Sequence, residues 1–329
     1  MYSNLPQGFT VKSPRPDEIQ RVYEFVKMCE IAQDGQPDIY LADVEEKWQQ
    51  PDFNLATDTV MVLNSDGHIA GYGFVRELTR PTITMVLYTG PDYYDQGISS
   101  FLLDLLEKRM SQEINQFDPT WQISFSNWTS SKNQVNRRLL EGRGYRQVRE
   151  FWQMEIKLAE PPADVAWPQG ITVRTLIPGQ DDRATYEAYE ATFGDHWGHI
   201  PISFEEYAQR RFTSKNFDPS LWFLAIDAST GAVAGYSCCS IDENFGWINN
   251  LGVKRAYRRT GLGLALLHHS FQKLYERGRP VVRLMVDGQS LTGATRLYIG
   301  AGMQLVLSFT RFEKEIRPGI SLDVKELAD

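Results

Sequence analysis

One stretch of the sequence combines positive charge with closely spaced glycines. It reads YRRTGLGLALLHHSF (257–271), with Arg258, Gly261 and Gly263 in the pattern RxxGxG. Glycines let the backbone coil tightly with several N–H groups pointing the same way, and a helix start adds free N–H groups and a partial positive charge. We therefore predict an anion-binding turn suited to phosphates, with a plain strand–helix turn as the alternative.

Two common phosphate-binding motifs do not match this turn. No Gly-Lys-Ser/Thr follows it, so a P-loop is excluded. Leu266 stands where the dinucleotide fingerprint has its third glycine, and no acidic residue closes a strand about 20 residues further on.

The turn belongs to an internal repeat. The stretch 93–107 matches 257–271, and further along the chain 138–145 matches 296–303. The offset between the two copies is smaller by six in the second match than in the first. This difference predicts six extra residues in the first copy, which we place near 113–122.

The repeat and a proline-rich segment define the expected domains. Residues 161–170 predict a linker between a first domain (1–160) and a second (171–329). In each half a strand and one or two helices precede a strand pair, a third strand, a turn with a long helix, and a final strand–helix–strand. This order predicts an α/β (α+β layered) fold with two tandem domains, each a mixed central sheet flanked by helices.

The long helix of the second half has an apolar stripe. Leu264, Leu267, Phe271 and Leu274 recur at spacings of three and four and are expected to face the sheet. His269 falls on the opposite side, where we expect it in solvent.

Together these motifs resemble the GNAT acetyltransferases. The turn lies between the strand 247–253 and an amphipathic helix, like the coenzyme A pyrophosphate motif of that family, and 286–303 resembles its second signature. The resemblance is specific in the second half and faint in the first, and the tandem arrangement resembles the two-domain branch that includes the mycothiol synthases. It implies an acetyl-CoA donor and a primary amine acceptor.

The resemblance also implies roles for individual residues. The pantetheine arm would lie along the strand at Leu251 to Val253, and Tyr298 would protonate the departing thiolate. Ser290 takes a position where the family often has asparagine. The pyrophosphate would bind the backbone N–H groups of Arg258, Arg259, Thr260, Gly261, Leu262 and Gly263.

The first copy lacks these chemical groups. Tyr94, Ser99 and Leu140 stand where the second copy has Arg258, Gly263 and Tyr298. A phenol, with a pKa near 10, can supply a proton to a thiolate, whereas a leucine cannot. We therefore expect a degenerate first domain and a catalytic second domain.

The general base is less evident. Trp247 stands where mycothiol synthases carry a glutamate on the strand before the turn. Asp287, at the end of a strand, is the first candidate, with Asp242 and Glu243 as alternatives that could instead be solvated turn residues. His196 is a further candidate, because an unperturbed histidine pKa near 6.5 suits a general base. Asn249 could orient a water in the acceptor site.

A histidine-containing segment is expected at the acceptor wall. It includes His196, Trp197 and His199 in the stretch 192–201, with structural packing as the alternative. A histidine pair without other ligands is a weak metal motif, so we expect no metal.

Composition excludes several other classes. The net charge of −8 disfavours nucleic acid as a partner. Three cysteines (Cys29, Cys238 and Cys239) form no disulfide framework, which fits a reducing cytoplasm. No secretory signal is visible, and no apolar run reaches the roughly 18 residues of a membrane helix. The oligomeric state is not readable from the sequence.

The expected function is therefore a cytoplasmic, acetyl-CoA-dependent N-acetyltransferase of a small-molecule primary amine. One alternative keeps the fold and takes protein N-termini or lysines as acceptors. Another is a non-catalytic tandem module that binds an acyl-CoA.

Overall fold

The computed structural model describes residues 4–50, 53–77, 81–194, 196–242, 244–290 and 293–322. The chain forms two compact units: one runs up to Glu150 and includes Ser308–Leu322, and the other is Phe151–Leu307. The first boundary between these units therefore falls before the expected linker 161–170, which contains no helix or strand.

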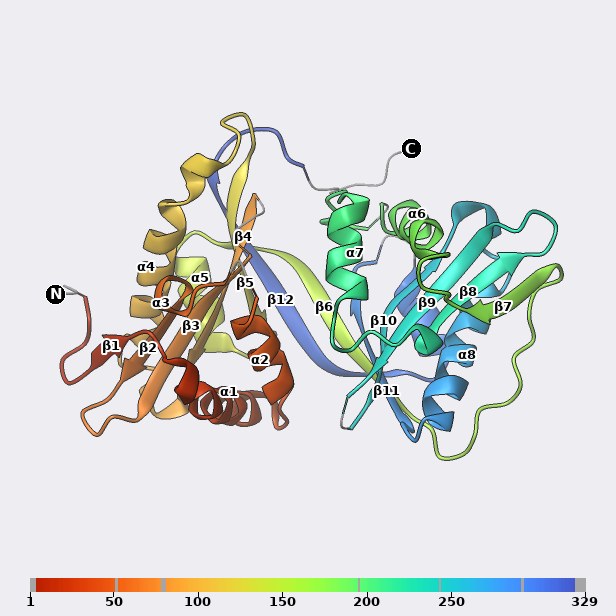
Figure 1. Ribbon diagram of the computed structural model, residues 1–329. Helices are drawn as coiled ribbons and strands as arrows, with labels where there is room; N and C mark the ends of the chain where they lie inside the picture. Colours follow the sequence, from red (N-terminus) through yellow and green to blue (C-terminus); the bar gives the residue numbers. More distant parts are fainter. Residues whose placement is uncertain are drawn as a thin grey trace. The chain divides into compact units, whose positions relative to one another are not determined.

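The first unit is a mixed sheet with helices on both faces (Figure 1). A Cβ at Gly71 would lie 2.5 Å from Ile98 on one face, whereas Tyr72 packs with α1 residues on the other. The strands, in spatial order, are β1 (Thr10–Lys12), β2 (Thr59–Leu63), β3 (Ile69–Glu77), β4 (Thr82–Thr89), β5 (Ile123–Ser130) and β12 (Gln304–Arg317). The helices are α1 (Ile19–Asp34), α2 (Leu41–Trp48), α3 (Leu55–Asp58), α4 (Ile98–Ser111) and α5 (Gln134–Gly142).

The second unit repeats this plan. A Cβ at Gly246 would lie 2.8 Å from Leu274 on α8, and one at Gly252 would lie 2.5 Å from Thr192 on α6, so these helices cover opposite faces. The strands, in spatial order, are β6 (Arg146–Lys157), β11 (Val281–Asp287), β10 (Gly246–Val253), β9 (Val233–Ile241), β8 (Trp222–Asp227) and β7 (Ile171–Thr175). The helices are α6 (Asp182–Phe193), α7 (Phe204–Phe212), α8 (Leu262–Glu276) and α9 (Ala294–Gly300).

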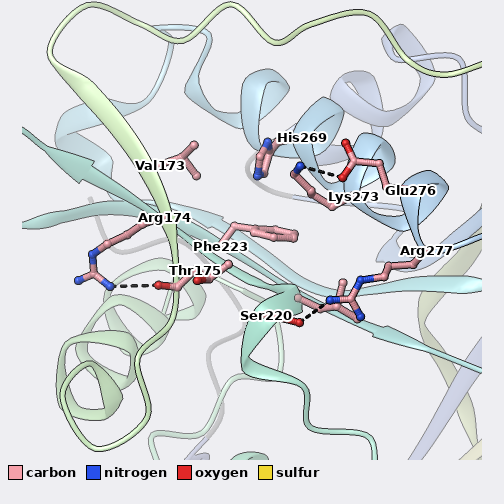
Figure 2. A pocket seen from close by; sticks show the side chains of 10 residues that line it. Val173, Arg174, Thr175, Ser220, Phe223, His269, Lys273, Glu276 and Arg277 are labelled. Carbon is pink, nitrogen blue, oxygen red and sulfur yellow. Dashed lines mark hydrogen bonds and ion pairs between the residues drawn. The ribbon is translucent and has the colours of Figure 1, made fainter.

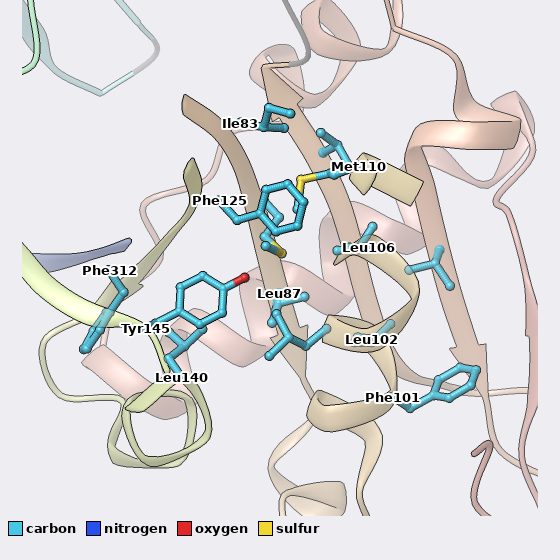
Figure 3. Close-up of a cluster of buried hydrophobic side chains, with 14 of the residues drawn as sticks. Ile83, Leu87, Phe101, Leu102, Leu106, Met110, Phe125, Leu140, Tyr145 and Phe312 are labelled. Carbon is cyan, nitrogen blue, oxygen red and sulfur yellow. The ribbon is translucent and has the colours of Figure 1, made fainter. Parts of the chain in front are cut away.

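The last strand of each half completes the other half's unit. From Phe151 onward β6 pairs antiparallel with β11, whereas β12 pairs antiparallel with β5. Phe312 on β12 is fully buried in the first unit's core with Leu140 and Tyr145 (Figure 3).

The predicted repeat is confirmed by the positions of corresponding strands. The two ends of β4 and β10 have the same offset as the matched stretches 93–107 and 257–271. The starts of β5 and β11 have the smaller offset of the stretches 138–145 and 296–303. The extra residues of the first copy lie between α4 and β5, where a short 3-10 helix (Ile114–Gln116) is inserted.

One part of the predicted stripe on α8 is wrong. Leu267, Phe271 and Leu274 are buried, but Leu264 is 40% exposed. Leu264 has nearly the same helical angle as Phe271, seven residues later. Its exposure therefore reflects its place in the first turn of the helix and not a different helix face.

Candidate active site

The second unit's sheet opens between its two central parallel strands. β10 and β11 pair at Gly246↔Val282 and Trp247↔Arg283. Beyond these positions β10 continues along β9 to Val253, and β11 continues along β6 to Asp287. The facing edges of β10 and β11 therefore diverge after two residue pairs.

A β-bulge lies where the strands part. The β10–β9 register shifts between Ile248 and Asn250, so Asn249 is the extra residue. Its side chain is exposed, and its Nδ2 donates to Ser240 Oγ at 2.8 Å. In the described part of the chain, no side chain of β11 or α9 is recorded in a hydrogen bond to residues 248–253. This edge is thus free to receive the amides of an extended ligand.

The glycine turn presents a row of free donors. Arg259 and Gly261 have positive φ angles of 64° and 88°, and α8 begins at Leu262. Among the described residues, the backbone N–H groups of 259–264 have no recorded acceptor. Successive N–H groups in such a conformation, followed by a helix start, form an anion-binding nest.

Side chains fix this turn to the sheet. Arg258 Nε donates to the carbonyl oxygen of Val253 at 3.1 Å, and Thr260 Oγ1 donates to that of Tyr257 at 2.7 Å. The Tyr257 hydroxyl donates to Asp227 Oδ2 at 2.8 Å; hydrogen bonds from Ser229 and then from Tyr257 lower the pKa of Asp227 to about 2. Arg258 thus ties the turn to the end of β10.

The turn, β10 and α9 meet at Gly263. A Cβ there would lie 3.4 Å from Leu297 Cδ2 and 3.7 Å from Val253 Cγ2. Tyr298 follows Leu297 on α9 and belongs to a buried cluster against which Leu251 packs. The residues expected to bind the cofactor and the expected acid are therefore brought together in one unit.

Tyr298 is a buried, protonated phenol. Its side chain is 8% exposed, and burial raises the pKa of Tyr298 to about 12. No hydrogen-bond partner of the Tyr298 hydroxyl is recorded in the described part of the chain. This hydroxyl is also not one of the fully buried polar atoms that lack a partner, so part of its surface is accessible. Ser290, before α9, accepts a hydrogen bond from the N–H of Ala294 at 3.3 Å.

The carboxylates considered as bases differ in their surroundings. Both carboxylate oxygens of Asp242 accept hydrogen bonds from the protein. Oδ1 accepts from the N–H groups of Asn244 and Phe245 at 2.8 and 2.6 Å, and Oδ2 accepts from Trp247 Nε1 at 2.6 Å. Asp287 lies at the end of β11, where its Oδ1 accepts from the N–H of Gln289 at 2.9 Å. Glu243 lies outside the described residues.

The segment after α6 is held by aromatic and polar contacts. The His196 ring lies 4.3 Å from that of Phe193, and Trp197 is partly buried. His199 Nε2 lies 3.2 Å from Glu190 Oε2, with 6% of the histidine side chain exposed. The sequence does not predict the contact between Glu190 and His199, because their separation follows no motif.

The described residues contain no cluster of three or more His, Cys, Asp or Glu side chains that could hold a metal. Nor does any described helix have both the length and the apolar character to cross a membrane.

Comparison with known proteins agrees with this geometry. Residues 183–303 match the acetyltransferase (GNAT) family. The crystal structure of a GCN5-related N-acetyltransferase from Sphaerobacter thermophilus superposes with a TM-score of 0.87 and 34% identity, covering 96% of this chain and 98% of that one. The chain therefore belongs to the GCN5-related N-acetyltransferase (GNAT) family and is an acyltransferase.

Its particular form is the tandem one. A tandem GNAT protein from the clavulanic acid biosynthesis pathway shares the fold, with a TM-score of 0.69 at 14% identity over 95% of this chain and all of that one. A mycothiol acetyltransferase from Pseudarthrobacter chlorophenolicus is 27% identical over 258 residues, which cover 76% of this chain and 74% of that protein. The resemblance inferred from the two motifs is confirmed.

Proposed function

We propose that the second unit transfers an acetyl group from acetyl-CoA to the primary amine of a small molecule. The observation that carries this proposal is the row of free N–H groups at 259–264, placed beside the unbridged edge of β10. A phosphate group and an extended amide chain are the two chemical features that such a surface complements.

Each part of the donor then has a place. The pyrophosphate binds the N–H groups of the turn, and Arg258 adds a full charge. The pantetheine amides pair with β10 at Leu251 and Val253, which directs the thioester toward the divergence of the strands. One β10 N–H group stabilises the negative charge that develops on the thioester oxygen.

Tyr298 supplies the proton that the departing thiolate needs. Burial raises the pKa of Tyr298 to about 12, so the phenol is still protonated at neutral pH when the C–S bond breaks and can donate to the departing thiolate. When the amine attacks the thioester carbon, the new N–C bond forms and the C–S bond breaks. Tyr298 gives its proton to the sulfur and is reprotonated from solvent.

We assign the base role to Asp287, acting through water. Trp247 has no basic group, and both carboxylate oxygens of Asp242 already accept hydrogen bonds from the protein. Asn249 orients the water, and His196, Trp197 and His199 form the acceptor wall. In Asp287→Asn the plateau of kcat/KM against pH should fall more than in Asp242→Asn. An unchanged profile in both variants would mean that the enzyme selects the neutral fraction of the amine.

The relatives and the chain itself support the remaining assignments. The GNAT match at 183–303 lies in the second half, and the relatives named for mycothiol favour a small-molecule acceptor. The three cysteines are free and buried, which fits the cytoplasm. We therefore assign catalysis to the second half (171–329) and regard the first (1–160) as degenerate.

Titration calorimetry with coenzyme A tests the site. One tight site per chain is expected, and Arg258→Ala should weaken it by about tenfold, as loss of a charged hydrogen-bonding group does. Tyr94→Ala, the matched change in the first unit, should leave the affinity unchanged. Two equal sites would contradict the assignment.

A screen of thiol release from acetyl-CoA with small amines and with peptides then separates the acceptor classes. Turnover with a small amine supports the proposal. Turnover confined to peptides would favour a protein acceptor, and binding without any turnover would favour the non-catalytic module.

A further inference from the structure

A separate cavity of about 410 Å³ lies in the second unit, between the edge strand β7, the start of β8 and the C-terminal half of α8 (Figure 2). Its volume is in the range of small-molecule sites, roughly 300–1,000 Å³. The lining residues are Val173, Arg174, Thr175, Ser220, Leu221, Phe223, His269, Lys273, Glu276 and Arg277.

This cavity is distinct from the proposed coenzyme A site. The turn uses the first residues of α8, whereas the cavity uses residues from His269 onward. The helix from Gly263 to Lys273 rises about 15 Å. The cavity also lies at the β7 side of the sheet, away from the divergence of β10 and β11.

His269 is one wall of the cavity, contrary to the expectation that it lies in solvent. Its ring is half-buried and packs edge-on, with centroid distances of 4.7 Å to Phe223 and 5.5 Å to Trp167. Burial, and secondly the charge of Lys273, lowers the pKa of His269. Its ring nitrogens have no recorded partner in the described chain, so the neutral imidazole offers one donor and one acceptor.

The charged lining is electrically balanced. Lys273 Nζ lies 2.8 Å from Glu276 Oε2, with these side chains 38% and 49% exposed. Arg277 faces Asp218 at 3.3 Å. Arg174 makes two hydrogen bonds to a carboxylate outside the cavity, at 2.5 and 2.8 Å.

This balance selects the charge of a ligand. A bare anion would be repelled by Glu276, and a bare cation by Lys273. An exposed ion pair contributes little stability, so a ligand carrying both charges can replace it. Phe223 and Leu221 are 1% and 2% exposed, so they lie beneath this polar lining and offer a ligand almost no apolar surface.

We propose that this cavity binds a free α-amino acid. The ligand carboxylate pairs with Lys273 and accepts a hydrogen bond from His269. The ligand ammonium pairs with Glu276. The site is independent of acetyl transfer, and the bound amino acid is not the acceptor.

Titration calorimetry on the full chain tests this proposal with L-phenylalanine and L-leucine as probes. At least one of them is expected to bind at one site per chain. 3-Phenylpropionate lacks the ammonium and 2-phenylethylamine lacks the carboxylate. Each should bind at least about tenfold more weakly than L-phenylalanine, because one charged partner is left unpaired.

Matched variants locate the binding. Lys273→Gln and Glu276→Gln should each weaken it about tenfold or more. Glu206→Gln breaks an equally exposed pair on α7, that with Arg210 at 2.6 Å, and should change nothing. Tyr298→Phe and saturating coenzyme A should also leave the affinity unchanged.

Several results would overturn the proposal. Absence of binding by both amino acids would do so, as would 3-phenylpropionate binding as tightly as L-phenylalanine, which would indicate an anion site. Loss of binding with coenzyme A present would place the ligand in the coenzyme A site, and acetylation of the amino acid would place it in the acceptor site.

Discussion

The divergent parallel strands of the two units differ in what fills the space between them. In the first unit, Asn127 Nδ2 donates to the carbonyl oxygen of Met85 at 3.1 Å, and Asn136 Nδ2 donates to that of Leu87 at 3.5 Å. The corresponding residues of β10 are Asn249 and Leu251, which no described side chain of β11 or α9 bridges. The first unit thus satisfies with its own side chains a strand edge to which, in the second unit, no described side chain of β11 or α9 is hydrogen-bonded.

The glycine turns differ in the same sense. Ser99 Oγ lies 2.8 Å from Thr89 Oγ1, so a buried hydrogen bond occupies the place of Gly263 and Val253. A Cβ at Gly97 would meet Pro6 at 3.6 Å, whereas one at Gly261 meets no atom within 4 Å.

A further side-chain hydrogen bond joins α1 to the end of β5 in the first unit. Ser130 Oγ donates to Asp34 Oδ1 at 2.7 Å. In the first unit these polar groups find partners within the protein while the sheet is kept, as the proposed loss of its site requires.

The largest expected effect concerns the boundaries of the second unit. The fragment 151–307 retains β6 and should fold as a soluble monomer that binds coenzyme A. The fragment 171–329 lacks β6, leaves the edge of β11 unpaired and should aggregate. Circular dichroism, size-exclusion chromatography and calorimetry distinguish the two. Equal behaviour of both fragments would show that the exchanged strand is dispensable.

A paired substitution tests the acid. Tyr298→Phe should lower kcat by roughly 10²–10⁴-fold while coenzyme A still binds, because the ring remains and only the proton is lost. Leu140→Tyr places the phenol in the first unit and should add no activity, since the strand edge there is bridged. In the unmodified enzyme kcat should not fall between pH 7 and 10, because burial raises the pKa of Tyr298 to about 12. Normal turnover in Tyr298→Phe would leave this residue with a packing role.

The single variants Gly263→Ser and Ser99→Gly test how the two turns differ in coenzyme A binding. Gly263→Ser introduces a side chain at the meeting point of the turn, β10 and α9 and should weaken coenzyme A binding about tenfold. Ser99→Gly should create no second site, because Pro6 and the asparagines remain, and should lower stability by about 1 kcal/mol through the lost hydrogen bond. A second coenzyme A site in Ser99→Gly would refute the closure of the first unit.

Another expected effect is a pH dependence confined to the first unit. Burial raises the pKa of Glu30 to about 7, despite N–H groups of Asp38 and Ile39 that donate to it. Because the folded value lies above the unfolded one, the stability that Glu30 contributes is fully present below about pH 4.5. It is lost as the pH rises through 7, and amounts to on the order of 3 kcal/mol.

Urea unfolding at pH 5 and pH 8 measures this dependence. Glu30→Gln should reduce the difference in the free energy of unfolding between the two pH values. Glu24→Gln, at an exposed position on the same helix, should leave that difference unchanged. If the free energy of unfolding changes equally between pH 5 and pH 8 in all three proteins, the pH dependence belongs to other groups.

The sequence was sufficient for most of the elements and for the conformation of the glycine turn, because glycines, charges and apolar spacing are local signals; the roles of the site residues stay predictions. Arg258, Gly263 and Leu251 lie where the motif predicts. The hydrogen bonds from Asn127 and Asn136 to the carbonyl groups of β4 could not be predicted from the sequence. The letter for asparagine is the same whether its side chain faces water or a carbonyl group.

The exchange of β6 and β12 was not readable for a related reason. Each strand is similar in pattern to the other, and the pairing depends on how the two copies fit in space. The exposure of Leu264 likewise depends on which elements lie above the first turn of α8, which periodicity does not specify.

The placement of Phe312 in the first unit has a consequence for synthesis on the ribosome. Leu140 and Tyr145 are synthesised long before this phenylalanine, which lies in the last strand of the chain and packs against them. At roughly 5–20 residues per second the nascent first half waits on the order of ten to thirty seconds with β5 lacking its neighbour. The N-terminal half is therefore made first and completed last, and its exposed strand edge is the part of the nascent chain that a chaperone would shield.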